Sequence, residues 1–285
     1  MRGGIKTIGV VGSGTMGSGI AQLSAMAGYL TILYDVNEGA LPHAVKVIEK
    51  NLKTAVQKGK LEEAALEKAR ASITTTTDVN DVKADLIIEA IVEDLAAKQN
   101  LFKLLAVFNR EETIFASNTS TIPITRIASV VRNPERVAGM HFFNPPHIMK
   151  LVEVIAGAAT SEKTTQTLMA VATKMGRTPA LAKDSPGFIV NRVARPYYVE
   201  ALKLLEERVA DHETIDKLME ASGFRMGPFR LMDLIGVDAN FNVTKSLYES
   251  FWHEPRFRPS RLQQQMVEAG LHGRKTGKGF YEYES

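Results

Sequence analysis

Residues 12–17 of this chain read GSGTMG and fit the pattern G-x-G-x-x-G, whose glycines suit a loop that holds phosphate groups. Gly12 permits a tight turn, Gly14 lets the backbone approach a pyrophosphate, and Gly17 lets a helix pack closely on a strand. A helix that begins at such a loop adds unpaired N–H groups and a partial positive charge. The loop therefore predicts a dinucleotide as ligand.

An acidic residue follows this loop at a useful distance. Asp35 lies 18 residues beyond Gly17, near the spacing of about 20 at which a carboxylate binds a ribose 2′-hydroxyl. Val36 and Asn37 come next, so neither Arg nor Lys stands beside the acid to bind a 2′-phosphate. The pattern favours NAD over NADP.

A histidine and a glutamate could transfer a proton. His141 lies at the end of one expected strand, just before a loop, and Glu153 lies inside the next apolar run, where a carboxylate is costly to bury unless it has a partner. Each alone is more often structural. As a pair, Glu153 would fix the tautomer of the ring and leave its other nitrogen available for proton transfer.

The elements around these residues must place them together. An apolar run at residues 8–11 precedes the glycine loop, a helical pattern covers residues 18–28, and a second apolar run at 30–34 ends in Asp35. A glycine pattern alone is weak evidence, but strand, loop, helix, strand and acid in this order make it strong.

Strands and helices continue to alternate after Asp35. The expected strands are residues 73–76, 85–90, 113–117, 136–143, 149–155 and 177–182, and the expected helices between them are residues 38–58, 62–71, 94–108 and 162–175. Such alternation predicts a parallel sheet covered by helices, with ligands at the carboxyl ends of its strands. Glu93 and residues 117–121 (SNTST) fall at those ends, although turn and cap chemistry would also explain Ser, Asn and Thr there.

The turn-forming residues 183–187 (KDSPG) mark a domain boundary. Beyond it the periodicity is helical over residues 188–209, 214–221, 240–251 and 260–268, followed by a glycine-rich basic loop at 273–281. Pro196 predicts a kink in the first of these helices. The fold class is an α/β Rossmann-type NAD-binding domain, residues 1–184, followed by an all-α C-terminal domain, residues 185–285.

The helix predicted at residues 38–58 carries a basic face. Lys46, Lys50 and Lys53 lie beside its apolar stripe, and Lys58 stands near its end. A solvated face is the ordinary interpretation. Contact with a second polyanionic ligand is the alternative, because the helix belongs to a nucleotide-binding region.

Composition limits the function classes. Of the residues 45% are hydrophobic and 24% charged, which is ordinary for a globular protein. The absence of cysteine excludes disulfides and thiolate metal sites, and no metal site is expected. A net charge of +3 is too small to argue for nucleic acid. With neither a signal peptide nor an apolar run of about 20 residues, we expect a cytoplasmic enzyme that does not enter a membrane.

Taken together, the motifs resemble the L-3-hydroxyacyl-CoA dehydrogenase family, most closely its compact bacterial members that act on 3-hydroxybutyryl-CoA. The resemblance covers essentially the whole chain. It rests on GSGTMG, EAIVED (89–94), FASNTS (115–120), GMHFFNP (139–145), KLVEVI (150–155), DSPGFIVNR (184–192), MGPFRLMD (226–233) and GRKTGKGFY (273–281).

This resemblance implies roles for particular residues. His141 and Glu153 correspond to the catalytic pair, and Ser120 and Asn191 to the polar residues that contact the substrate. The residues expected at the cofactor are Gly12, Gly14, Thr15, Met16, Gly17, Asp35, Glu93, Lys98 and Asn118. The basic helix corresponds to the segment that covers CoA in relatives, which assigns Lys50, Lys53 and Lys58 to the substrate.

The implied activity is the reversible NAD-dependent oxidation of a short-chain (S)-3-hydroxyacyl-CoA to the 3-ketoacyl-CoA, by a homodimer joined through the helical domain. Two alternatives remain open. The chain could oxidise a free hydroxy acid or sugar acid, or it could be a catalytically silent NAD-sensing protein on the same scaffold.

Overall fold

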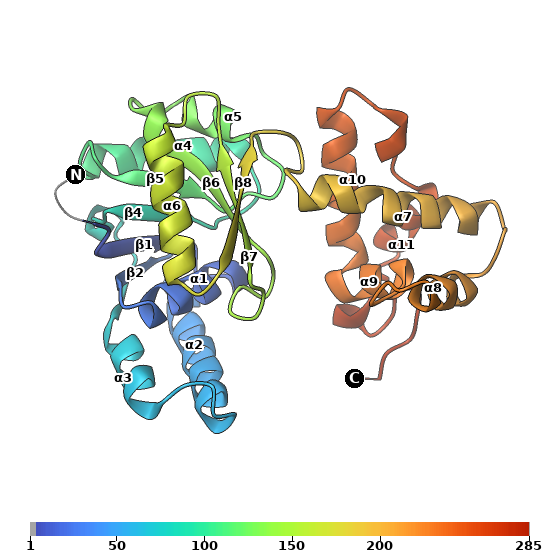
Figure 1. The fold of residues 1–285 in the computed structure, drawn as a ribbon, viewed down its shortest axis with the longest axis horizontal. Helices are drawn as coiled ribbons and strands as arrows, with labels where there is room; N and C mark the ends of the chain where they lie inside the picture. The colour runs from blue at the N-terminus through green and yellow to red at the C-terminus, as the bar shows by residue number, and fades with distance from the viewer. Residues whose placement is uncertain (1–3, 285) are drawn as a thin grey trace. The chain divides into compact units, whose positions relative to one another are not determined.

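The computed structural model describes residues 4–284, and the chain divides into two compact units, Met1–Ser185 and Pro186–Ser285. Each unit has its own secondary structure (Figure 1) and is described by itself.

The first unit is built on one eight-stranded sheet with the order β3-β2-β1-β4-β5-β6-β7-β8. The strands are β1 (Thr7–Val11), β2 (Leu30–Tyr34), β3 (Ile73–Thr76), β4 (Leu86–Glu89), β5 (Ile114–Ser117), β6 (Val137–Phe142), β7 (Leu151–Ala156) and β8 (Thr178–Lys183). The first six strands in this order, from β3 through β2, β1, β4 and β5 to β6, run parallel to one another. Their order is that of the dinucleotide-binding fold.

The parallel arrangement ends at β7, which runs antiparallel to β6. Residues 143–150 join these two strands without a helix, and so short a segment cannot make the crossover that a parallel pair needs. The chain therefore turns back. This reversal places residues of β6 and β7 directly opposite one another.

Helices cover both faces of the sheet. They are α1 (Thr15–Met26), α2 (Ala40–Gln57), α3 (Glu63–Ala71), α4 (Leu95–Phe108), α5 (Ile124–Ala128) and α6 (Glu162–Lys174). Figure 1 shows α6 in front of the sheet and α4 behind it. The front core joins Ile20 of α1, Ile48 of α2, Leu168 of α6 and strand residues such as Val10. The central strands β1, β4, β5 and β6 are almost wholly buried, which explains their continuous apolar sequence.

The short helix α5 was not predicted from the sequence. Its first N–H groups are those of Ile124 and Thr125, and both donate to the carboxylate of Asp184, at 2.9 and 2.7 Å. Asp184 thus caps this helix although it lies 59 residues from Thr125 in the sequence. Local sequence around α5 contains no such cap.

The second unit is helical. It contains α7 (Val190–Glu206), α8 (His212–Ala221), α9 (Pro228–Ile235), α10 (Val237–Ser250) and α11 (Arg261–Glu268). The last of these helices is capped by Ser260, whose side chain accepts from the Gln263 N–H. The helix α7 is continuous through Pro196. Its Tyr198 and Leu202 pack with Ile215, Phe229 and Met232 to form the core.

The sequence prediction missed α9. The N–H groups of Phe229 and Arg230 in its first turn donate to buried Asp216 of α8, each at 2.9 Å. Within residues 4–284, no helix has both the length and the apolar character needed to cross a membrane.

Candidate active site

The three glycines of the loop after β1 have different surroundings. Gly12 has φ +98°, and a Cβ there would lie 2.6 Å from the Ala90 carbonyl oxygen. A Cβ on Gly17 would lie 1.7 Å from the Gly12 carbonyl oxygen, because α1 packs tightly on the loop. A Cβ on Gly14 would meet nothing within 4 Å. Two glycines are therefore needed by the fold, whereas Gly14 faces open space.

The loop leads into a helix end suited to an anion. Gly14 is the N-cap of α1 and supplies no side-chain cap, and exposed Thr15 and half-buried Met16 form the first turn. The opening N–H groups of a helix have no intrahelical acceptor and carry partial positive charge. With open space above Gly14, these residues fit the pyrophosphate of NAD.

Asp35 follows β2 and is held by its neighbours. Its Oδ2 accepts from the N–H and the hydroxyl of Ser13, both at 2.7 Å, and its Oδ1 accepts from the Asn37 N–H at 2.9 Å. Burial alone would raise the pKa of Asp35, but the hydrogen bonds from Ser13 and Asn37 lower it. The ionised carboxylate thus lies beside the glycine loop, as a ribose-binding acid requires. The sequence did not reveal the part played by Ser13.

His141 and Glu153 are cross-strand partners in the antiparallel pair β6–β7. Nδ1 of His141 lies 2.8 Å from Oε2 of Glu153, and the side chains are only 5% and 1% exposed. The ring of Phe143 packs against the imidazole, with centroids 4.6 Å apart. Burial and a close carboxylate give the ring a fixed orientation.

A third side chain reaches the other ring nitrogen. The hydroxyl oxygen of Ser120, in the loop after β5, lies 3.1 Å from Nε2 of His141. The imidazole is thus bracketed by a carboxylate on one nitrogen and a hydroxyl on the other. This arrangement can accept a proton from a hydroxyl at Nε2 and stabilise the resulting charge.

Glu93 and Lys98 belong to a polar cluster beside this loop. The Lys98 ammonium is 1% exposed and contacts Glu89 at 2.6 Å and Glu93 at 3.4 Å. Sequence reasoning assigned Lys98 to the cofactor but did not identify the buried Glu89. Two features could have drawn attention to it, since Glu89 ends an apolar strand and precedes Lys98 by nine residues.

Two asparagines were expected at the site. The Oδ1 of Asn118 accepts from the N–H of Phe142 at 2.8 Å, which ties the end of β5 to the end of β6. Asn191 lies in the first turn of α7, in the second unit. Its part in the site stays a prediction.

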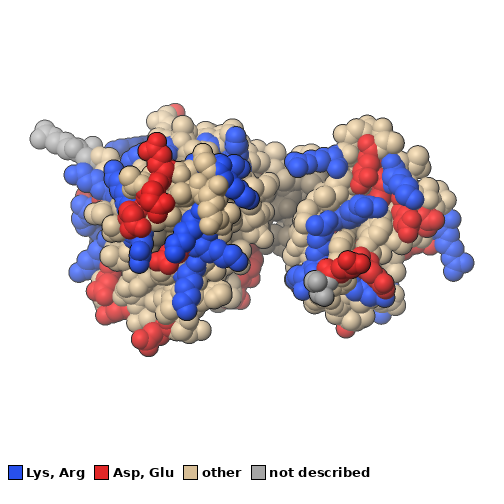
Figure 2. Space-filling view, turned by 90° about the horizontal axis from the view of Figure 1, so that it is seen from below, with Lys and Arg blue, Asp and Glu red and all other residues tan. Residues whose placement is uncertain are grey.

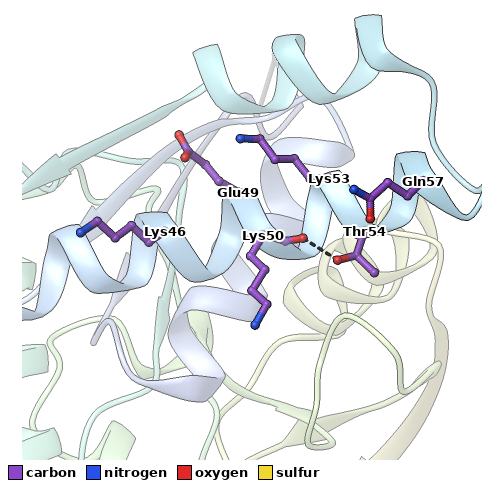
Figure 3. Close-up of a pocket in the computed structure, with 6 residues that line it drawn as sticks. All are labelled: Lys46, Glu49, Lys50, Lys53, Thr54 and Gln57. Carbon is purple, nitrogen blue, oxygen red and sulfur yellow. Dashed lines mark hydrogen bonds between the residues drawn. The ribbon is translucent and has the colours of Figure 1, made fainter.

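The basic helix α2 has a hollow of about 400 Å³ on its surface, lined by Lys46, Glu49, Lys50, Lys53, Thr54 and Gln57. Figure 3 shows that the side chains of Lys50 and Lys53 point in different directions from the helix. Lys58 follows the last residue of α2 and is exposed. The lysines therefore form a broad basic surface rather than a converging cage.

Charges elsewhere are mixed. On the face shown in Figure 2, basic and acidic side chains are interspersed over each unit. Across residues 4–284, His, Asp and Glu side chains form no group of three or more able to hold a metal ion.

Residues 7–185 match the family model described as "3-hydroxyacyl-CoA dehydrogenase, NAD binding domain", and residues 187–283 match its C-terminal domain. The chain belongs to the 3-hydroxyacyl-CoA dehydrogenase family. The family resemblance, the two-part fold class, the NAD-dependent dehydrogenase class and the cofactor NAD, all predicted from the sequence, are confirmed.

Several relatives of this dehydrogenase are similar over almost the whole chain. The 3-hydroxyadipyl-CoA dehydrogenase of Escherichia coli is 46% identical over 99% of this chain, which spans only 60% of that protein's length. The probable 3-hydroxybutyryl-CoA dehydrogenase of Bacillus subtilis is 45% identical over 98% of both chains. The crystal structure of (S)-3-hydroxybutyryl-CoA dehydrogenase from Ralstonia eutropha is similar with a TM-score of 0.94 and 40% identity, covering 99% of this chain and 100% of that one.

Proposed function

We propose that this dehydrogenase catalyses the reversible oxidation of (S)-3-hydroxybutyryl-CoA to acetoacetyl-CoA with NAD. The observation that carries the proposal is the His141 ring, with Glu153 on one nitrogen and Ser120 on the other. Relatives named 3-hydroxybutyryl-CoA dehydrogenase, similar over the whole chain, support the choice of substrate.

Proton transfer follows from the charges around the ring. The Glu153 carboxylate is an acceptor, so Nδ1 of His141 carries the proton in their hydrogen bond and Nε2 is the basic nitrogen. In oxidation, Nε2 removes the proton of the 3-hydroxyl, and Glu153 stabilises the imidazolium that forms. In reduction, the same Nε2 proton is donated to the 3-keto oxygen. A positioned group of this kind contributes about 10²–10⁴-fold.

The remaining site residues position the reactants. Ser120 and Asn191 hydrogen-bond the substrate oxygens and restrict the orientation of C3. The glycine loop, the first turn of α1 and Asp35 hold the cofactor. When bound there, NAD supplies the acceptor for the electrons and hydrogen that leave C3.

Exposed lysines extend the proposal to the CoA moiety. Lys50, Lys53 and Lys58 lie on or just beyond α2, and their ammonium groups would attract the phosphates of CoA. This feature favours a CoA ester over a free hydroxy acid.

Assembly and location belong to the same proposal. The NAD-binding domain is residues 1–184, and residues 185–285 form the substrate and dimerisation domain of a cytoplasmic homodimer. The chain passes from the first compact unit to the second between Ser185 and Pro186.

A substrate comparison tests the activity. Initial rates with NADH should be high for acetoacetyl-CoA and low for free acetoacetate. In the oxidative direction, with NAD, sugar acids should react slowly, and 3-hydroxyadipyl-CoA and longer 3-hydroxyacyl-CoAs are tested beside them. A preference for a free acid would overturn the proposal, and loss of all turnover with NADH binding intact would favour the silent NAD-sensing alternative.

A further inference from the structure

A buried ion pair lies at the carboxyl edge of the sheet. Glu89, the last residue of β4, is 0% exposed, and its Oε1 lies 2.6 Å from Nζ of Lys98 in α4. The same Oε1 accepts from the Ile91 N–H at 2.7 Å, and Oε2 accepts from the Ser117 hydroxyl at 2.6 Å. Both oxygens of this carboxylate therefore have hydrogen-bond partners.

Stability alone is a poor reason for such a pair. Burying two charges costs several kcal/mol per ion, and apolar residues of similar volume often serve the fold equally well. What the pair does provide is a fixed ammonium group. The Lys98 ammonium also lies 3.4 Å from Oε2 of Glu93, whose side chain is 40% exposed. This contact helps to orient the Glu93 carboxylate.

Glu93 in turn holds the loop after β5. Its Oε1 accepts from the Thr119 hydroxyl at 2.6 Å, the Ser120 N–H at 2.9 Å, the Thr121 N–H at 3.0 Å and the Thr121 hydroxyl at 3.1 Å. Burial alone would raise the pKa of Glu93, but the Lys98 charge and these hydrogen bonds lower it. One ionised oxygen therefore anchors three successive residues.

The middle residue of that loop contacts the catalytic ring. With the Ser120 backbone held by Glu93, the Ser120 hydroxyl lies 3.1 Å from Nε2 of His141. The contacts run without interruption from Glu89 through Lys98, Glu93 and Ser120 to the nitrogen that exchanges the proton.

We propose that Glu89 is a positioning residue for the proton-transfer site, acting through Lys98 and Glu93 to fix the loop that carries Ser120. The inference rests on the proposed function, because it gives Ser120 and His141 their roles there. It adds that part of the catalytic geometry is set by a buried pair that does not touch the substrate.

The test replaces the pair without leaving an unpaired charge. Glu89→Gln together with Lys98→Met removes both charges with little change in volume, so the variant should fold. Misplacement by about 1 Å can cost about 10²-fold, and we expect kcat for acetoacetyl-CoA to fall by about 10- to 100-fold. The matched control is Asp85→Asn with Arg110→Met, an ion pair at the amino end of the same strand, which should leave kcat unchanged.

Coupling to Ser120 separates positioning from a general structural or cofactor role. When Ser120 is already Ala, adding the Glu89–Lys98 replacement should lower kcat by less than about threefold relative to Ser120→Ala alone. The reason is that the residue through which the pair acts is already truncated. An equal loss in both backgrounds would overturn the inference, as would a parent-like kcat for the folded pair variant.

A second readout does not depend on turnover. The amide hydrogens of Ser120 and Thr121 donate to Glu93, so they should exchange with solvent at least about tenfold faster in the pair variant and unchanged in the control. Unchanged exchange would refute the loop clamp whatever the substrate proves to be. Faster exchange in an enzyme inactive on acetoacetyl-CoA would support the clamp and count against the proposed function alone.

Discussion

His141 and Glu153 face one another because β7 runs antiparallel to β6, and this register brings Nδ1 to 2.8 Å from Oε2. The segment from residue 143 to 150 is too short for a crossover, so the topology itself creates the pair. A parallel β7 would have placed Glu153 elsewhere. The proton-transfer proposal therefore depends on the antiparallel pairing of β7 with β6.

The first prediction concerns the coupling of this pair. His141→Ala should lower kcat by about 10² or more, the scale of a positioned acid–base group. Glu153→Gln should also be severe, since an amide cannot stabilise imidazolium. The double variant should be little worse than His141→Ala alone, because residues that act as a unit give non-additive losses.

Stability measurements provide the control for these variants. A purely structural role would lower the melting temperature, with kcat falling only in proportion to the folded fraction. Thermal melts beside the kinetics separate the two effects. Early melting with normal turnover per folded molecule would refute the catalytic pair.

A second prediction contrasts two glycines of the same loop. Gly17→Ala places a Cβ 1.7 Å from the Gly12 carbonyl oxygen, so we expect a loss of about 1–3 kcal/mol or more in the free energy of unfolding. Gly14→Ala meets nothing within 4 Å and should change it by less than about 0.5 kcal/mol. The added methyl group should nevertheless weaken NADH binding by about tenfold.

Urea unfolding and NADH fluorescence titration measure the two effects separately. If Gly14→Ala binds NADH as the parent does, the pyrophosphate does not approach this backbone.

Much of the first unit could be predicted because its signals are local. The glycine loop, the apolar strands and Asp35 each carry their meaning within a few residues. The buried cluster around Glu89 could not be predicted this way, because β4, α4 and the loop after β5 meet only through the topology of the sheet. Ser13 donates to Asp35 across 22 residues of sequence, which periodicity does not report.

Two helices were missed for a physical reason. Both α5 and α9 are short, and each is capped by an aspartate distant in sequence, Asp184 and Asp216 respectively. Short helices have little intrinsic stability, so tertiary caps decide whether they form. For α9 a local signal did exist, since Pro228 stands at its first position and Gly236 follows its end.

The third prediction concerns cofactor choice. Asp35→Ala should reduce the preference for NADH over NADPH, because we propose that this carboxylate binds the ribose diol and repels a 2′-phosphate. Ser13→Ala removes the hydroxyl that donates to Asp35 at 2.7 Å and should lower kcat/KM for NADH by about tenfold. Steady-state kinetics with both cofactors measure the effect.

Ser18→Ala is the matched control, since its hydroxyl donates to the Thr15 carbonyl at 3.3 Å instead of to Asp35. Equal efficiency of the parent with NADPH would refute the role of Asp35. A parent-like Ser13→Ala would limit that role to Asp35 itself.

A fourth prediction tests the basic surface near α2. Neutralising Lys50, Lys53 and Lys58 to Gln should raise KM for acetoacetyl-CoA at least about threefold at low ionic strength, since each exposed charge contact contributes about 0.2–1 kcal/mol. The effect should fade at high salt because ions screen exposed charges. NADH affinity should not change.

The control neutralises three exposed lysines elsewhere, Lys103, Lys163 and Lys245, with the same change in net charge. Equal KM values for the two triple variants at low salt would mean that the α2 lysines form an ordinary solvated face and do not bind CoA.

The last prediction links Glu93 to acid stability. Burial tends to raise its pKa, but the charge of Lys98 and the hydrogen bonds from residues 119–121 lower it below the ordinary value of 4.5. A carboxyl whose pKa is lower in the folded state contributes stability that is fully present above its unfolded pKa. That contribution is lost as pH falls through the folded pKa.

Glu93→Gln should therefore unfold at lower urea concentration than the parent at pH 7, and the difference should shrink below about pH 4.5 as the parent protonates its own Glu93. The control is Glu67→Gln, which neutralises an exposed glutamate of α3 in the same unit and should track the parent at every pH. Urea unfolding of the first unit, followed from pH 7 to pH 3.5, measures both. A gap between Glu93→Gln and the parent that persists undiminished at the acid end would mean that Glu93 stabilises the loop by shape and not by charge.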